Sequence, residues 1–366
     1  MASMRQILYF VGAGLSKALE QPGKRIPLMA DFLATMADHL HNQVVQVGLA
    51  HFERQHALAW PLQPEIRRFI DKVTGRVAPT PSEIEEVGTL LKRLPAENIE
   101  ALLSESPGMK NRVSFLINAI FCEVGWDVNW NSLDQFLIRK LAEKDASHTL
   151  VSFNYDLLLD RRVQEVSPRL GLAWDPQDGY GFHALPARGS EDIFDTDSGG
   201  TARVECEGSK LKILKPHGSL NWVAQFEGNY EFVDKSPRII FENDGTLVYW
   251  PQFDVGLLQS IFLIPPMEAK ASSLGFIHRI LDLERGAVTR ADEIYVLGWS
   301  MPETDTDQVC LIGDAIRRRR RPLEHLTIVN SGAQIAYFDR VASTFGLPPA
   351  AIRVFNAGFA DFSRTL

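Results

Sequence analysis

Ile7-Leu8-Tyr9-Phe10-Val11 runs directly into Gly12-Ala13-Gly14-Leu15-Ser16, and these ten residues indicate the fold class. The first five residues form a short, continuous apolar run, which is typical of a strand that is buried on both faces of a parallel sheet. The two glycines permit a tight turn, and the residues after them open a predicted helix. A strand, a glycine turn and a helix in direct succession are the first unit of an α/β fold.

Five further short apolar runs predict the other strands of the same sheet. Each run ends in small or polar residues, and helix-like stretches separate the runs. We therefore expect an α/β fold with a Rossmann-like parallel sheet flanked by helices. The runs cover residues 149–153, 212–214, 293–297, 326–329 and, more weakly, 352–355.

Residues 1–366 are expected to form a single domain with insertions. Residues from about 28 to 146 have few strand signals and much helical spacing, so a large helical insertion should follow the first strand. An acidic helix start at Ser82-Glu83-Ile84-Glu85-Glu86 belongs to it. Another helical face is predicted from the spacing of Leu133, Phe136, Leu137 and Leu141.

Loop and hairpin insertions are expected at about 175–211 and 223–266. The first is rich in Gly, Asp and Ser, and the second contains the turn signal Glu242-Asn243-Asp244-Gly245 before an apolar run.

Composition limits the class of protein. With 366 residues and 45% hydrophobic side chains the chain can bury a full core, which excludes disorder for most of it. No run of about 18 apolar residues predicts a membrane span, and the N-terminus lacks the plan of a signal peptide. The net charge of −8 argues against a dedicated nucleic-acid binder. Three dispersed cysteines, Cys122, Cys206 and Cys310, exclude a four-cysteine zinc site and fit a cytoplasmic, reducing compartment.

The carboxyl ends of the predicted strands carry unusual residues, and ligands of such sheets bind beyond these ends. We therefore expect one shared site there. Gly12 and Gly14 let the backbone approach a phosphate, and free N–H groups at the helix start would face the anion. Two glycines can also simply make a turn, but the strand before them and the helix after them favour diphosphate binding.

Two other strand ends carry polar residues. Asn154 and Asp156, in Ser152-Phe153-Asn154-Tyr155-Asp156, could hold a ribose and an amide. An Asx turn or a helix cap is the alternative, and on these residues alone it is the stronger one. Gly298 and Ser300 could reach a phosphate or a ribose, or could belong only to a strand-to-helix loop before Pro302.

His217 follows another predicted strand, within Lys215-Pro216-His217-Gly218-Ser219-Leu220-Asn221-Trp222. An imidazole can act as a base at neutral pH. A loop histidine that bonds a nearby carbonyl is an equally weighted alternative.

The remaining polar features favour structural roles. The basic run Arg317 to Arg321 suits a solvated helix C-terminus, with a patch for nucleic acid or an acidic partner as the lesser alternative. The three histidines His148, His183 and His278 lack metal-ligand spacing. The carboxylates Glu303, Asp305 and Asp307 could pass for a metal cluster, but we expect them to start the next helix.

Together these motifs resemble the sirtuin-like family, and its bacterial NAD-hydrolysing branch more closely than the protein deacylases. Four stretches carry the resemblance, in the family's order and at strand ends, over about residues 7–330. They are Gly12-Ala13-Gly14-Leu15-Ser16, Ser152-Phe153-Asn154-Tyr155-Asp156, Lys215-Pro216-His217-Gly218-Ser219-Leu220-Asn221-Trp222 and Leu297-Gly298-Trp299-Ser300.

The resemblance implies a role for each motif. Asn154 would sit by the nicotinamide ribose, Asp156 would hold the nicotinamide amide and His217 would be the base. The NAD diphosphate would lie along Gly12, Ala13, Gly14 and Ser16. The phosphate and adenosine side would be contacted by Gly298, Ser300, Asn330 and Ser331.

Two departures weaken a deacylase reading and leave the NAD site intact. Phe153 stands where deacylases usually carry Gln, and three dispersed cysteines cannot build the zinc module of those enzymes.

The resemblance therefore implies an NAD⁺ hydrolase that releases nicotinamide and ADP-ribose, in linear or cyclic form, without zinc or another metal. It also implies a gated effector of antiphage defence, with activity controlled by homo-oligomer formation or by a separate partner such as an ATPase or an Argonaute-type protein. No membrane is involved, and nucleic acid would act only indirectly. The alternatives are an NAD-dependent deacylase or ADP-ribosyltransferase, a non-catalytic NAD or ADP-ribose binding module, and DNA binding through the arginine run.

Overall fold

In the computed structural model, the described part of the chain comprises residues 4–22, 25–28, 32–56, 64–93, 107–125, 127–143, 145–172, 174–184, 186–187, 210–227, 231–232, 238–240, 247, 259–264, 275–302, 305–323, 325–331 and 335–366.

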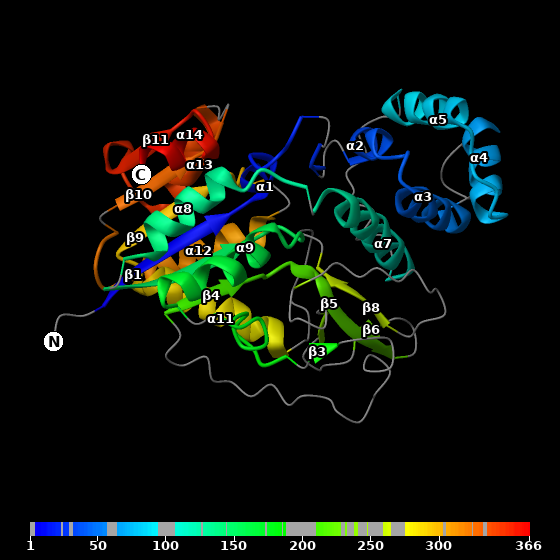
Figure 1. Cartoon of the computed structure of the whole chain (residues 1–366). Coiled ribbons are helices and arrows are strands. Elements are labelled where there is room, and N and C mark those ends of the chain that lie inside the picture. The colour runs from blue at the N-terminus through cyan, green and yellow to red at the C-terminus, as the bar shows by residue number, and fades with distance from the viewer. Residues whose placement is uncertain are drawn as a thin grey trace.

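Six parallel strands form the central sheet (Figure 1). Their order across the sheet is β11-β10-β9-β1-β2-β4. All six predicted strands are present, and the expected α/β, Rossmann-like sheet is confirmed. The strands are β1 (Arg5–Val11), β2 (Ala146–Ser152), β4 (Leu211–Leu214), β9 (Glu293–Leu297), β10 (His325–Val329) and β11 (Ile352–Phe355).

Helices cover both faces of the sheet because β1 is apolar on both sides. Tyr9 packs on Phe136 of α8 (Asn131–Leu141), with ring centroids 5.4 Å apart, whereas the next residue, Phe10, packs on Phe345 of α13 (Ile335–Phe345) on the opposite face, at 6.1 Å. The first face is covered by α8 together with α9 (Leu158–Val166) and α14 (Phe359–Thr365). The other is covered by α13 together with α11 (Gly275–Arg290) and α12 (Thr306–Arg317).

The strand order creates a switch point between β1 and β9. From β1 the chain continues to β2 on one side, and later it returns to place β9 on the other side. In doubly wound sheets of this order, ligands bind in the crevice beyond the carboxyl ends of the strands at this point.

The elements described between β1 and β2 are helices, joined by turns and loops. A short α1 (Ala13–Lys17) comes first, and the helices that follow it stand to one side of the sheet in Figure 1, apart from α8, which returns to the sheet. The predicted acidic helix start lies in α5, and the four predicted apolar positions of α8 are all buried. The helices beside the sheet are α2 (Phe32–Asp38), α3 (Gln43–His56), α4 (Pro64–Thr74), α5 (Pro81–Arg93) and α7 (Pro107–Val124).

A second, smaller sheet is mostly antiparallel. Its order is β3-β7-β5-β6, and β8 also pairs with β5. The predicted turn Glu242-Asn243-Asp244-Gly245 and most of the predicted loop 175–211 lie outside the described residues. The strands are β3 (Pro186–Ala187), β5 (Gly218–Glu227), β6 (Glu231–Phe232), β7 (Arg238–Ile240) and β8 (Gln259–Leu263), and two 3-10 turns lie at η1 (Ser167–Leu170) and η3 (Pro349–Ala351).

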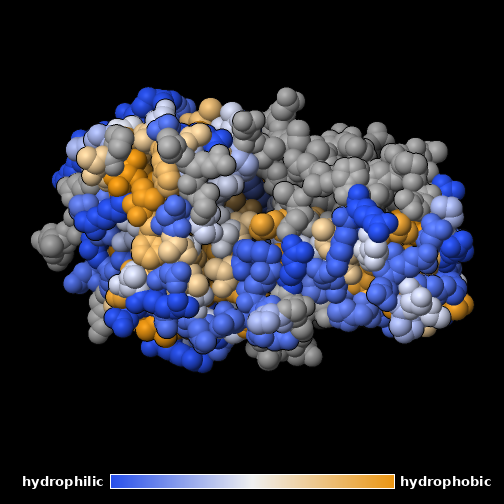
Figure 2. All heavy atoms as spheres, turned by 90° about the horizontal axis from the view of Figure 1, so that it is seen from above, coloured by the Kyte–Doolittle hydropathy of each residue, from blue (hydrophilic) through white to orange (hydrophobic). Residues whose placement is uncertain are grey.

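Polar and charged side chains cover much of the surface seen in Figure 2, with apolar side chains interspersed. Among the helices that the structure describes, none has both the length and the apolar content that a membrane span requires.

His148 on β2 is a buried histidine that couples stability to pH. Its Nδ1 lies 3.2 Å from the Tyr9 hydroxyl, and its Nε2 has no hydrogen-bond partner among the residues that the structure describes. Burial, and then the positive charges of Arg5 and Lys140, lower its pKa from 6.5 to about 4. Unfolding therefore takes up a proton below pH 6.5, so the contribution of the neutral imidazole to stability is complete above pH 6.5 and is lost as the pH falls toward 4.

Replacing this imidazole should flatten the pH dependence of stability. Between pH 7 and pH 5 we expect the free energy of unfolding of the wild type to fall by about 2 kcal/mol more than that of His148→Phe, which has no imidazole to protonate. Urea denaturation at both pH values measures the difference. Tyr9→Phe is the matched control. It breaks the same contact by removing the Tyr9 hydroxyl, but it keeps the His148 imidazole. Equal pH dependence in the wild type and His148→Phe would contradict this assignment.

Candidate functional site

The turn after β1 is locked against the end of β9. The Gly12 N–H donates to Leu297 O at 3.0 Å, and the Gly14 N–H donates to Gly298 O at 2.9 Å. A Cβ atom at Gly12 would lie 2.5 Å from the Trp299 Cα, so only glycine permits this approach. The two strand ends at the switch point therefore form one interlocked backbone unit.

This interlock limits how the turn could bind an anion. The Gly14 N–H is donated to Gly298 O and the Leu15 N–H to Gly12 O, so these two amides are not available to a phosphate. Ala13, between the two glycines, is exposed. The main role of the two glycines is to allow close packing of the two backbone segments. An anion bound here would contact Ala13 and the side chains on the other side of the turn.

A pocket of about 830 Å³ opens beyond the carboxyl ends of the strands. That volume is in the range of roughly 300–1,000 Å³ that small-molecule and cofactor pockets occupy. Every one of the eleven residues expected from the sequence lines this one pocket. They are Gly12, Ala13, Gly14, Ser16, Asn154, Asp156, His217, Gly298, Ser300, Asn330 and Ser331.

A chain of hydrogen bonds joins the first two motifs. The Asn154 Nδ2 donates to Gly12 O at 3.1 Å and to Ser16 Oγ at 2.9 Å, and Ser16 Oγ donates to Asp156 Oδ2 at 2.8 Å. Both N–H bonds of the Asn154 amide are thereby engaged. Its Oδ1 accepts no hydrogen bond from the residues that the structure describes, so this oxygen can accept one from a ligand or from water.

Asp156 combines a structural and a pocket role. Its Oδ1 accepts the Leu158 N–H at 3.0 Å at the start of α9, which is the Asx-type turn that the sequence offered as the alternative. The same side chain is 5% exposed and lines the pocket. Burial raises the pKa of the Asp156 carboxyl, and the nearby Lys215 charge, the Leu158 N–H and the Ser16 hydroxyl partly oppose this effect.

A buried ion pair connects the second and third motifs. The Lys215 ammonium donates to Asp156 O at 2.6 Å and to Asp160 Oδ2 at 3.2 Å, and the Tyr180 hydroxyl donates to Asp160 Oδ1 at 2.6 Å. Lys215, Asp160 and Tyr180 are all fully buried. Because an unpaired charge at this depth is costly, the pair fixes the loop after β2 to the turn after β4.

His217 lies in a tight turn between β4 and β5. The Gly218 N–H donates to Lys215 O at 3.1 Å, with Pro216 second in the turn, and Gly218 has a φ of +81° that favours glycine. His217 O accepts the Ile264 N–H at 2.8 Å. The imidazole is 3% exposed and lies 5.4 Å from the Phe153 ring, measured between centroids. Its Nε2 is 3.7 Å from Asp305 Oδ1.

Asp305 was expected only to start a helix, and this expectation is incomplete. Helix α12 does begin after it at Thr306, but the Asp305 side chain makes no capping bond and lines the pocket. Asp307 lies in the first turn of α12 as expected, whereas Glu303 lies outside the described residues. In the described part of the chain, no three His, Cys, Asp or Glu side chains are grouped so that they could hold a metal ion.

The sequence missed several other parts of the pocket wall. Trp299 could have been included, since it lies between Gly298 and Ser300 in a motif already identified. Phe121 carried no signal, because it comes from α7, far from any strand end. The remaining unpredicted lining residues are Lys17, Ala18, Pro27, Leu28, Phe153, Tyr155, Pro302, Ala357, Gly358, Phe359 and Ala360.

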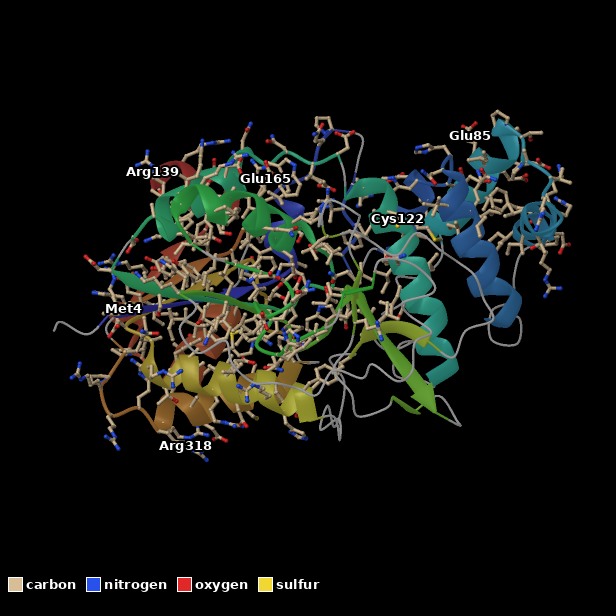
Figure 3. All side chains as sticks on the ribbon, turned by 60° about the horizontal axis from the view of Figure 1, so that its bottom comes forward. Met4, Glu85, Cys122, Arg139, Glu165 and Arg318 are labelled. Carbon is tan, nitrogen blue, oxygen red and sulfur yellow. The ribbon has the colours of Figure 1, made fainter. Side chains whose placement is uncertain are left out.

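The features that the sequence assigned to structural roles lie elsewhere. His183 is outside the pocket, where its Nδ1 lies 2.7 Å from Asp178 Oδ1, and His278 is exposed on α11. In the arginine run, Arg319 donates to the Val288 and Ala291 carbonyls, and Arg318 projects from the outer surface at the end of α12 (Figure 3). Figure 3 also shows Cys122 on α7, where burial raises the pKa of its thiol to about 12.

Alanine at the glycine after β9 should damage the interlock. Gly298 and Gly171 have φ values of +63° and +70°, so alanine costs about 1–2 kcal/mol of backbone strain at either position. At Gly298 a Cβ atom would also lie 2.5 Å from the Leu15 N, whereas at Gly171 it would meet nothing within 4 Å. We expect Gly298→Ala to lower the free energy of unfolding by about 2 kcal/mol more than Gly171→Ala. Equal losses of unfolding free energy in the two variants, measured by urea denaturation, would show that the contact between Gly298 and the Gly14–Leu15 backbone is not rigid.

Neutralising Asp156 should leave the fold intact. A raised carboxyl pKa means that the folded protein favours the uncharged form, so an amide of the same shape does not bear the cost of a buried charge. We expect the thermal midpoint of Asp156→Asn at pH 7 to equal or exceed that of the wild type. Differential scanning calorimetry tests this, and a fall of more than about 5 °C would show that the charge itself holds the loop.

Comparison with known proteins adds no relative. No protein-family model matches the chain, and a search of curated proteins finds no match. What the pocket can do is therefore inferred from its own residues.

Proposed function

We propose that this chain is an NAD⁺ hydrolase that cleaves the bond between nicotinamide and ribose to give nicotinamide and ADP-ribose. One observation carries the proposal: the strand-end residues expected for this reaction, drawn from five strand ends, line a single pocket at the switch point of the sheet. The pocket brings together an amide oxygen, an imidazole and a buried carboxyl.

The proposed reaction needs positioning more than acid catalysis. The nicotinamide nitrogen is cationic in NAD⁺, so it leaves as a neutral ring that takes the electron pair of the broken C–N bond. Asn154 Oδ1 accepts a hydrogen bond from the attacking water, and His217 accepts the proton that this water loses as its oxygen bonds to the ribose carbon. The atoms and charges then balance as nicotinamide, ADP-ribose and one proton.

The other walls suit the rest of the dinucleotide. Asp156 would hold the nicotinamide amide. The diphosphate and adenosine side would lie along Ser16 and the exposed Ala13, and along Gly298, Ser300, Asn330 and Ser331 at the ends of β9 and β10. Aromatic rings form part of the wall: Phe153 and Trp299 stack with centroids 4.3 Å apart. An apolar enclosure favours cleavage because it keeps water other than the nucleophile away.

The activity would be gated, since uncontrolled loss of NAD⁺ harms the cell that makes the enzyme. We therefore include in the proposal a role in antiphage defence, with activation by homo-oligomer formation or by a separate partner such as an ATPase or an Argonaute-type protein. The resemblance of the strand-end motifs supports this part of the proposal.

Nicotinamide release from NAD⁺ tests the hydrolase. We expect Asn154→Ala and His217→Ala each to lower the rate at least ~100-fold, because positioned proton transfer contributes about 10²–10⁴-fold. Chromatography of the products, at several protein concentrations and with candidate partners added, measures the rate. His183→Ala is the control, since that histidine is not among the residues that line the pocket and contacts surface-exposed Asp178. Full activity in both pocket variants would refute the assignment.

The same experiment separates the alternatives. Transfer of an acyl group from an acyl-lysine peptide to ADP-ribose, with nicotinamide release that depends on the peptide, would favour a deacylase. Calorimetric binding of NAD⁺ or ADP-ribose without turnover in the presence of every candidate partner would favour a non-catalytic module.

A further inference from the structure

Asp305 occupies a position where helix capping would ordinarily explain an acidic residue. It directly precedes α12, yet its side chain makes no capping bond. It is instead 3% exposed and lines the pocket. Burying a carboxylate away from water costs desolvation energy, so the partners of Asp305 in the pocket require an explanation.

Two contacts orient the Asp305 carboxylate. Its Oδ2 accepts the Trp299 indole N–H at 2.8 Å, and its Oδ1 lies 3.7 Å from His217 Nε2. Trp299 is itself fixed. Its ring stacks on Phe153, and Trp299 O accepts a hydrogen bond from the Tyr337 hydroxyl at 2.8 Å. A rigid support thus aims one carboxylate oxygen at the imidazole.

The distance to His217 suits an electrostatic role. A separation of 3.7 Å is too long for a hydrogen bond but short enough for strong attraction between charges. Both side chains are almost fully buried, so water screens this attraction little. Contacts between catalytic groups also tend to shorten when substrate binds.

Other titratable groups around His217 are already engaged. Lys215, in the same turn, donates to Asp156 O and to the Asp160 carboxylate. Tyr155, from the loop after β2, donates its hydroxyl to Ile264 O at 3.1 Å, and Asp156 from that loop accepts the Ser16 and Leu158 donors. These groups are the same in all the variants below, so a change between variants reports on Asp305.

We infer that Asp305 is a positioning residue for His217: its carboxylate orients the imidazole and stabilises the positive charge that His217 gains when it takes the proton from water. This inference rests on the proposed function for its catalytic consequence. The pairing itself stands on the geometry of the Trp299, Asp305 and His217 side chains.

Kinetics of Asp305→Asn test the inference, because the amide keeps the shape and can still accept the indole N–H but carries no charge. We expect kcat for nicotinamide release to fall at least ~10-fold, with KM for NAD⁺ within about threefold. We also expect the acid limb of the pH–rate profile to move to lower pH, because without the carboxylate the imidazole is protonated less readily. Asp307→Asn is the matched control: it makes the same change at an exposed carboxylate in the first turn of α12, outside the pocket, so its acid limb should stay where the wild type has it.

Two kinetic results would overturn the inference. One is an acid limb in Asp305→Asn that coincides with that of the wild type. The other is an equal shift in Asp307→Asn, which would mean that loss of any nearby negative charge moves the acid limb.

A titration without substrate keeps this test separate from the test of the proposed function. The imidazole of His217 is followed by ¹⁵N NMR of the full chain, with its signals assigned by their loss in His217→Gln. A protonation midpoint that is lower in Asp305→Asn than in the wild type supports the pairing even if no NAD⁺ is hydrolysed, in which case the proposed function fails alone. An unchanged midpoint overturns the pairing even if NAD⁺ is hydrolysed.

Discussion

The geometry of the pocket starts from the close approach of two backbone segments at the switch point. Gly12 and Gly14 after β1 meet Gly298 and Trp299 after β9 at distances that leave no room for a Cβ atom. Two amide-to-carbonyl bonds hold the segments together. Because parallel strands deliver their carboxyl ends to the same edge, this one contact sets the position of the pocket and of the motifs around it.

Buried hydrogen bonds then hold the loops at the other strand ends in place around this contact. Asn154 bonds Gly12 and Ser16, and Ser16 bonds Asp156, so the loop after β2 is held to the glycine turn. Lys215 and Asp160 hold that loop to the turn that carries His217. Each bond satisfies a polar group that would be costly to bury alone.

The sequence predicted the sheet well, because strands buried on both faces appear as continuous apolar runs, and the six runs became the six strands. It also predicted which residues share the pocket, since strand ends of a parallel sheet must converge. It could not predict that the Gly14 N–H is taken by Gly298 O, because that depends on a contact between distant segments. For the same reason it assigned Asp305 to a helix start: capping is a local pattern, whereas the contacts to Trp299 and His217 are tertiary.

The two pocket carboxylates, Asp156 and Asp305, would contribute to different stages of the proposed reaction. Positive charge moves from the nicotinamide nitrogen toward the ribose carbon as the bond breaks, and only interactions that strengthen during this movement lower the barrier. If Asp156 holds the nicotinamide amide, its contact is present in bound substrate as well, so it contributes mainly to binding and orientation. Asp305 faces an imidazole that becomes charged only as the reaction proceeds, and its attraction therefore grows toward the transition state. A pocket with both kinds of carboxylate can bind the dinucleotide with one and assist its hydrolysis with the other.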